Sequence, residues 1–292
     1  MDKVDYLNKF NLIVGIDIEI SGSKVRLASW GLIKELISSS DVVLEVVDVR
    51  DPINTRSTKL ESLVLNSGKS LIIVLNKSDL VPREVAERWK EYFKSLGFKS
   101  VYISARDRLG TRVLRSEISK IVKRPLVIAV VGVPKVGKST LINTLKGRHS
   151  ASTSLLPGSP GYTVKSQLYR IGRGVYLIDT PGLIPPDSGD VESVIRSEHI
   201  DKIDNIISVA VELIKKVLKF NKTAFKDAYK IDEVDPYKIL EALALKRGWV
   251  SRSDREPLLH EAAKAVIRDY FDGKISYYYT PDEVGSGTFK VG

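Results

Sequence analysis

The chain has no cysteine, one methionine and three histidines among its 292 residues. Without cysteine it cannot form a disulfide, a zinc–thiolate site or a thiol nucleophile. Its longest apolar runs, 70–75 and 125–133, are far shorter than the roughly 20 residues that cross a bilayer. The N-terminal stretch MDKVDYLNKFN has mixed charge and no apolar signal-peptide core. We therefore expect a globular cytoplasmic protein with no membrane partner.

Positive charge is in excess, but it is unevenly distributed. The formal net charge is +10. Residues 1–182 carry 29 Lys and Arg against 17 Asp and Glu, whereas residues 183–292 carry 17 against 19. A basic surface favours polyanions, of which nucleic acid is the commonest partner. The alternative interpretation is a solvated face that binds no partner.

Apolar runs alternate with segments of helical spacing in the first two thirds of the chain. The alternation predicts an α/β fold, a doubly wound and mostly parallel sheet covered on both faces. Helical spacing predicts a single helix over 54–66, and a short strand is expected at 15–21. The other strands are expected at 41–49, 70–75, 100–103, 125–133 and 174–180.

The pattern changes after Gly182. The sequence PPDSG at 185–189 reads as a linker, and apolar residues at helical spacing follow it. We expect a first domain over 1–185 and an all-helical C-terminal domain over 190–292. The tail from Gly273 is aromatic and then glycine-rich, and we expect it to be frayed.

The sequence GVPKVGKS at 132–139 matches G-x-x-x-x-G-K-[ST] between a predicted strand and a predicted helix. Backbone N–H groups of such a loop wrap phosphates, and Lys138 should reach the β- and γ-phosphates. The Ser139 hydroxyl should bind Mg²⁺, and the helix N-terminus favours the anion. The residues expected around the phosphates are Pro134, Lys135, Val136, Gly137, Lys138, Ser139 and Thr140.

Two further segments should complete the phosphate and metal site. In DTPG at 179–182, Asp179 should hold Mg²⁺ and the Gly182 N–H should sense the γ-phosphate. In the Pro/Gly-rich stretch before it, Thr163 should cover the γ-phosphate and the metal; the alternative is a loop without a ligand role. Lys138, Thr163 and Gly182 are the predicted catalytic group.

The sequence NKSD at 76–79 predicts a guanine site. Asp79 can accept hydrogen bonds from both N–H donors of the guanine edge, which adenine lacks. Asn76 should tie this loop to the base and to the phosphate loop, and the Lys77 stem should pack on the base. In SAR at 104–106, Ser104 and Ala105 should lie at the base, with the Ala105 N–H meeting the guanine oxygen. The predicted cofactors are therefore GTP or GDP with Mg²⁺.

The motifs occur in a cyclically shifted order. The base-reading loop and SAR come first, and the phosphate loop, Thr163 and DTPG follow. In a doubly wound sheet such a shift joins old termini that can lie close together. It attaches the helical domain directly behind DTPG, so that nucleotide state can move that domain.

This order resembles the circularly permuted GTPases of the YlqF/YawG (RbgA-like) family, which act in ribosome assembly. DVVLEVVDVRDP at 41–52 and much of 243–281 also resemble family segments. The resemblance implies a GTP hydrolase that binds a pre-ribosomal particle, usually the large subunit, and leaves after hydrolysis. We expect the large subunit or rRNA as partner, no DNA, and a monomer.

The chain departs from the family pattern at several positions. Many members have Asn in place of Lys135, and that Asn often helps to hold a potassium ion. The Lys135 ammonium either takes that place or points to solvent, which leaves a monovalent cation in doubt. Leu183 stands where Ras-like enzymes have a catalytic glutamine and cannot orient water. No histidine lies near the N-terminus to replace it, so we expect slow intrinsic hydrolysis.

Three functions remain open at this point. The first is a GTPase switch that binds rRNA. The second is a regulatory GTPase with a protein partner and no RNA, and the third is a nucleotide-binding scaffold with negligible turnover. The basic residues that could contact RNA, or could equally form a solvated helix face, are Arg106, Arg108, Arg112, Arg115, Lys120, Lys123 and Arg124.

Overall fold

The computed structural model describes residues 28–121, 124–146, 167–179, 184 and 190–284. In this part of the chain six strands form one sheet in the order β3-β2-β1-β4-β6-β5. All neighbours pair in parallel except β5 and β6, which are antiparallel. The predicted mostly parallel α/β sheet is therefore confirmed. The strands are β1 (Val42–Asp48), β2 (Ser70–Asn76), β3 (Lys99–Tyr102), β4 (Leu126–Val131), β5 (Gln167–Gly172) and β6 (Val175–Asp179).

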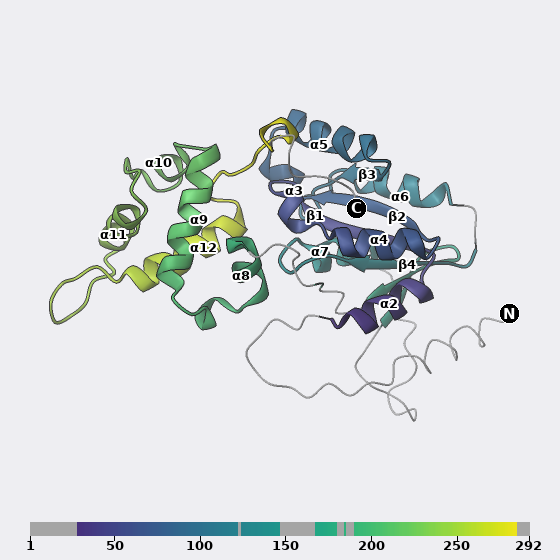
Figure 1. The fold of residues 1–292 in the computed structure, drawn as a ribbon, viewed down its shortest axis with the longest axis horizontal. Helices are drawn as coiled ribbons and strands as arrows, with labels where there is room; N and C mark the ends of the chain where they lie inside the picture. The colour runs from purple at the N-terminus through teal and green to yellow at the C-terminus, as the bar shows by residue number, and fades with distance from the viewer. Residues whose placement is uncertain (1–27, 122–123, 147–166, 180–183, 185–189, 285–292) are drawn as a thin grey trace, which may run out of the picture.

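Helices cover both faces of the sheet (Figure 1). Every residue of β1 and β4 is buried, as expected for central parallel strands with continuous apolar sequence. The helices of this part are α2 (Trp30–Ser39), α3 (Pro52–Thr55), α4 (Thr58–Asn66), α5 (Arg83–Ser95), α6 (Thr111–Ser119) and α7 (Lys138–Lys146), with a 3-10 turn at Ser78–Leu80.

The single helix predicted over 54–66 is wrong, because the chain breaks between α3 and α4. The buried Glu45 of β1 accepts a hydrogen bond from the Ser57 N–H at 2.6 Å. The Ser57 side chain in turn accepts from the Leu60 N–H and caps α4. A polar residue inside an apolar strand thus fixes where the helix begins.

A group of helices lies beside the sheet, on the side of α3 and α5 (Figure 1). It shares a core with the sheet, since one apolar cluster joins Leu75 of β2 and Trp89 of α5 to Ile214 and Val266 of the helical group. Its members are α8 (Val191–Ser197), α9 (Ile206–Phe220), α10 (Ala224–Tyr229), α11 (Pro236–Lys246) and α12 (Leu259–Asp272), with 3-10 turns at Ile200–Lys202 and Pro281–Glu283.

The tail after α12 is part of this shared core. Tyr277 and Tyr279 are 1% and 4% exposed. Trp89 Nε1 donates to the Tyr279 carbonyl oxygen at 2.9 Å, and the Tyr279 hydroxyl donates to Asp51 at 2.5 Å. The expectation of a frayed tail is therefore wrong for residues 273–284, because Tyr279 packs against Trp89 of α5 and Tyr277 against Phe220 of α9.

Strand β5 was not predicted. It forms a hairpin with β6, and Gly174 at φ +67° lies in the turn between them. The strand expected at 15–21 lies outside the described residues. Among the helices that the structure describes, none combines the length and apolar character of a bilayer crossing.

Candidate functional site

The phosphate loop joins the end of β4 to the start of α7, and two of its glycines lie where a side chain would collide. A Cβ at Gly132 would be 2.4 Å from the Val46 carbonyl oxygen, and one at Gly137 would be 2.3 Å from Asn76 Nδ2. Gly137 also has φ +94°, a backbone conformation that favours glycine. The motif therefore encodes a backbone path that passes closely over β1 and the guanine loop.

Lys138 and Ser139 open α7, where free backbone N–H groups and the helix dipole favour an anion. Lys138 is 7% exposed, and burial lowers the pKa of its ammonium group to about 7. Ser139 and Thr140 are exposed. A buried lysine whose pKa is lowered by burial gains most from an anionic partner, because that partner favours its charged form.

Asn76 links three loops at the carboxyl ends of the strands. Its Nδ2 donates to the Val136 carbonyl oxygen in the phosphate loop at 2.8 Å. Its Oδ1 accepts from the Ala105 N–H at 3.0 Å. The tie from Asn76 to the phosphate loop is thus present in the structure. A separate bond, from the Thr144 hydroxyl of α7 to the Ala105 carbonyl oxygen, spans 3.0 Å.

The Ala105 N–H, which we expect to meet the guanine oxygen, donates to Asn76 in the structure. Its contact with a bound base stays a prediction. Ser104 is fully buried, and its hydroxyl is 3.1 Å from Asp107 Oδ2. The two residues therefore shape the loop beside the predicted base site.

Asp79, the predicted base reader, forms an ion pair with the SAR arginine. Arg106 Nη2 lies 2.6 Å from Asp79 Oδ2. The Asp79 side chain is 12% exposed and the Arg106 side chain 63% exposed. Arg106 therefore covers the carboxylate that guanine would engage, and a bound base would have to take its place.

Lys77 has a left-handed backbone, with φ +66°. Its ammonium lies 2.9 Å from Asp48 Oδ2 rather than in solvent. Burial lowers the pKa of Lys77 to about 8, although the charge of Asp48 opposes this shift. The stem that we expected to pack on the base thus ends in a fixed contact with β1.

The Lys135 ammonium is bonded within the chain instead of pointing to solvent, which was one of the two paths considered from the sequence. Its ammonium donates to the carbonyl oxygens of Ile195 and Glu198, at the C-terminal end of α8. Carbonyl groups at a helix C-terminus lack intrahelical partners and attract cations. Although Lys135 as a whole is exposed, desolvation of its ammonium against the helical group and the charge of Arg196 lower the pKa of Lys135 to about 8. The residue thus connects the phosphate loop to the helical group.

The remaining predicted residues are described in part or not at all. Thr163, Gly182 and Leu183 lie outside the described residues, as does the side chain of Asp179. The backbone of Asp179 ends β6, which pairs with β4. The Ile184 N–H donates to the Gly132 carbonyl oxygen at 3.2 Å. Described residues on both sides of DTPG therefore lie near the phosphate loop.

Sequence reasoning missed a buried group of charges centred on Asp48. The Asp48 carboxylate is bonded by Arg50, with 3.0 and 2.8 Å contacts, and it also contacts Lys77 and Arg196. Burial alone would raise the pKa of Asp48, but the charge of Arg50 and the other two cations hold it well below its usual value. The charged sequence DVRDP could have indicated this group. It begins with the last residue of β1, at the sheet edge where Asn76 and Gly132 also lie.

Much of the predicted RNA-binding group makes contacts within the chain. Arg115 donates to the Leu145 carbonyl oxygen at the end of α7, and Arg124 to that of Ile121. Lys120 pairs with Glu117. All the described members of this group, including Arg108 and Arg112, are nevertheless exposed. Several of these basic side chains thus have partners within the chain and still face solvent.

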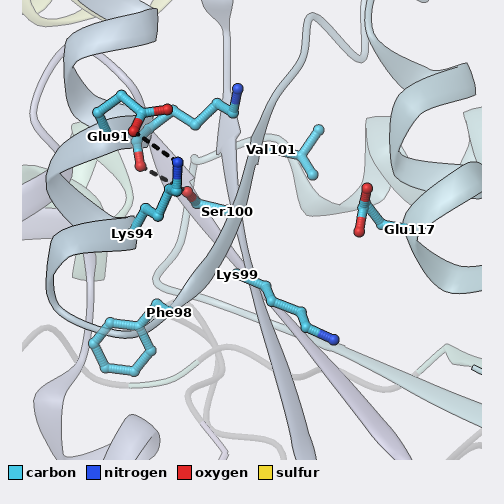
Figure 2. Close-up of a pocket in the computed structure, with 8 residues that line it drawn as sticks. Glu91, Lys94, Phe98, Lys99, Ser100, Val101 and Glu117 are labelled. Atoms are coloured by element: carbon cyan, nitrogen blue, oxygen red, sulfur yellow. Dashed lines mark hydrogen bonds and ion pairs between the residues drawn. The ribbon is translucent and has the colours of Figure 1, made fainter. Parts of the chain in front are cut away.

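A cavity of about 370 Å³ lies elsewhere, at the outer edge of β3. Figure 2 shows Glu91 and Lys94 on one side of it and Glu117 on the other. None of the residues predicted to bind nucleotide lines it. Its charges are of both signs, and Lys94 pairs with Glu91, so nothing in its lining selects a ligand.

Comparison with known proteins agrees with this geometry. A family model described as RsgA GTPase matches residues 25–188. The chain is 35% identical to an uncharacterized GTP-binding protein of Methanocaldococcus jannaschii, over 85% of this chain and 66% of that protein. It is 30% identical to nuclear GTP-binding protein NUG1 of Saccharomyces cerevisiae, over 97% of this chain and 61% of that protein. It spans about half to two thirds of the length of the curated relatives it matches.

The fold is also that of a solved structure. GDP-bound YlqF of T. maritima superposes with a TM-score of 0.66 at 24% identity. The match covers 86% of this chain and 99% of that one. The two proteins therefore share their circularly permuted architecture.

Proposed function

This chain belongs to the RsgA GTPase family, and from that premise we propose that it is a GTP-hydrolysing switch in ribosome assembly. It binds rRNA or a pre-ribosomal particle, and we propose the large subunit as the preferred one. It acts in the cytoplasm as a monomer, and DNA is not among its partners. The words nuclear and nucleolar in the names of relatives describe those proteins.

The observation that carries the proposal is the contact of Asn76 with the phosphate loop. Asn76 ends β2, and its amide reaches the Val136 carbonyl oxygen. Asp79 follows within the same loop, so a nucleotide on the phosphate loop would have its base directed toward that carboxylate. The permuted order of motifs is thereby compatible with a single guanine-nucleotide site.

Ser139, the predicted metal ligand whose side chain the structure describes, suits Mg²⁺ with GTP. Ser139 presents a hydroxyl oxygen at an exposed helix start, and hard oxygen donors are what Mg²⁺ prefers. Asp179 and Thr163 would complete its ligands, and the ion would neutralise charge on the phosphates. The contact of Lys135 with α8 supports the view that Lys135 does not replace a monovalent cation there.

A direct test is GTP hydrolysis by the purified protein, alone and with large ribosomal subunits. We expect slow turnover that large subunits stimulate, while small subunits at equal concentration serve as the matched control. Fast turnover of the isolated protein, or equal stimulation by both subunits, would contradict the proposal. Salt-dependent binding of rRNA would support direct contact with RNA.

A second candidate is a regulatory GTPase whose partner is a protein. The observation that favours it is that Arg106, Arg115 and Lys120, although exposed, already have partners within the chain. Nucleotide binding without response to ribosomal subunits or rRNA would support this candidate.

The assignment of the base reader can be tested separately. Asp79→Asn should reduce the preference for GDP over ADP by at least about a hundredfold, because the amide cannot accept from both guanine donors. Asp232→Asn is a matched control, since Asp232 is an exposed carboxylate that pairs with Lys226. Equal GDP affinity in the two variants would refute the role of Asp79.

A further inference from the structure

We propose that Lys135 and Arg196 are positioning residues through which helix α8 holds the phosphate loop, so that binding of the nucleotide's phosphates depends on docking of the helical group. The inference rests on the proposed function. It goes beyond it by naming the element that controls the loop and the two side chains that transmit that control.

Lys135 is the contact from the loop to the helix. It lies in the loop with a left-handed backbone, φ +63°, which is uncommon for a residue with a side chain. Its ammonium is held by the carbonyl oxygens of Ile195 and Glu198 and lies 4.8 Å from the Phe271 ring centre. The contacts that hold this unusual backbone conformation therefore come from α8 and α12.

Arg196 is the contact from the helix to the loop. Its side chain is fully buried, and Nη1 donates to the Pro134 carbonyl oxygen at 3.2 Å. Nε donates to Glu192 at 2.6 Å, which fixes the guanidinium on its own helix. The guanidinium also lies 3.5 Å from Asp48, which contacts the guanine-motif Lys77. Arg196 thus reaches the phosphate loop directly and the guanine loop through one shared carboxylate.

Three consecutive loop residues are held from outside the loop. Pro134 is held by Arg196, Lys135 by the end of α8, and Val136 by Asn76. Two of these three contacts come from the helical group. Separation of α8 from the sheet would remove both and leave the backbone N–H groups that cradle phosphates less well fixed.

Thermodynamic linkage then gives a reciprocal effect. If docking of α8 strengthens phosphate binding, bound nucleotide must strengthen docking of α8 by the same factor. A partner that pulls the helical group away from the sheet would release nucleotide.

The test compares Lys135→Met with Lys215→Met in the full chain. Lys215 is a matched control, because it pairs with Glu212 on the exposed side of α9. Lys135→Met should weaken GDP binding roughly 5- to 50-fold, and Lys215→Met should leave it unchanged. The loss should be the same for IDP, because base reading is not affected. Lys135→Arg, which keeps the donors, should recover most of the affinity.

Hydrogen exchange separates positioning from a simple loss of charge. In the wild-type protein GDP should slow exchange in α8, and in Lys135→Met this protection should disappear even when GDP is saturating. Exchange in α8 that does not respond to GDP in the wild type would overturn the proposal. So would a GDP affinity of Lys135→Met within twofold of the wild type. Wild-type protein that fails to bind GDP at all would instead refute the proposed function.

Arg196→Lys provides the second variant. It keeps the positive charge but cannot bond Pro134, Glu192 and Asp48 together. Where its melting temperature stays near that of the wild type, GDP affinity should fall as in Lys135→Met. Unchanged affinity in a folded Arg196→Lys protein would contradict the role of Arg196.

Discussion

At the scale of single residues, Gly137 is a position where the site tolerates little change. Gly137→Ala would place a methyl group 2.3 Å from Asn76 Nδ2, on a backbone with φ +94°. We expect GDP affinity to fall at least about tenfold and the free energy of unfolding to fall by about 1–3 kcal/mol. Fluorescent GDP titration and urea denaturation measure the two effects.

Gly68→Ala is the matched control for Gly137→Ala. Gly68 has φ +64°, but a Cβ there meets nothing within 4 Å. Gly68→Ala should lower the free energy of unfolding through backbone strain alone, without a collision. GDP affinity should not change. Equal effects of the two variants on GDP binding would argue against the role assigned to Gly137.

Lys138 leads to a prediction about protons. Burial lowers the pKa of its ammonium to about 7 without nucleotide, and bound phosphate should raise that pKa again. At pH 8 binding of GDP should therefore take up about one proton, and affinity should decline as the pH rises above 7. Calorimetry in buffers of different ionisation enthalpy measures this uptake, and a proton count near zero at pH 8 would contradict it.

The residues of the phosphate loop could be predicted because their spacing encodes a backbone path. Gly132, Gly137 and Lys138 occur in one short motif, and residues that are close together in the sequence define its backbone path. The contact of Lys135 could not be predicted, since its partner Ile195 lies 60 positions later. Arg196 and Asp48 are separated by 148 positions, and no local pattern indicates that they meet.

At the scale of elements, the segment after α12 should contribute to the stability of the fold through its buried tyrosines. Tyr279→Phe removes a hydroxyl that donates to the buried Asp51, which also pairs with Lys216. We expect the free energy of unfolding to fall by about 1–2 kcal/mol, because a charge-assisted hydrogen bond is lost. Chemical denaturation of Tyr278→Phe is the control, since Tyr278 is less buried. Equal losses would mean that the bond to Asp51 contributes little.

Strands were more predictable than connections and ends. Continuous apolar runs marked β1, β2 and β4 because both faces of these strands are buried. Among the described strands, β5 lies at the sheet edge and pairs only with β6, so its sequence needed no such run. Tyr277 and Tyr279 show no periodic pattern, and two of the rings that they contact, Phe220 and Trp89, are far away in the sequence.

At the scale of the whole molecule, buried charges connect the sheet to the helical group and should make the protein sensitive to acid. Burial alone would raise the pKa of Glu192, but the charges of Arg196 and Lys216 lower it from 4.5 to about 2. Because the folded pKa is the lower one, its contribution to stability is present above about pH 4.5. That contribution is lost as the pH falls from 4.5 toward 2.

Glu192→Gln should therefore lower stability at neutral pH and flatten its dependence on pH between 4.5 and 2. The lost slope should be at most about 1.4 kcal/mol per pH unit, the value for one proton. Urea unfolding at a series of pH values measures it. Glu212→Gln, which alters an exposed pair with Lys215, should leave the slope unchanged. A wild-type slope in Glu192→Gln would show that other carboxylates dominate acid unfolding.

The order of the loops along the chain has a consequence for the protein's own synthesis. A growing polypeptide emerges with the guanine loop first, the phosphate loop about sixty residues later and α8 last of the three. While α8 is still inside the ribosome, Pro134 and Lys135 lack the helix that holds them, and the apolar surface around Trp89 is uncovered. The newborn chain should thus bind its nucleotide firmly only after α8 has emerged from the ribosome.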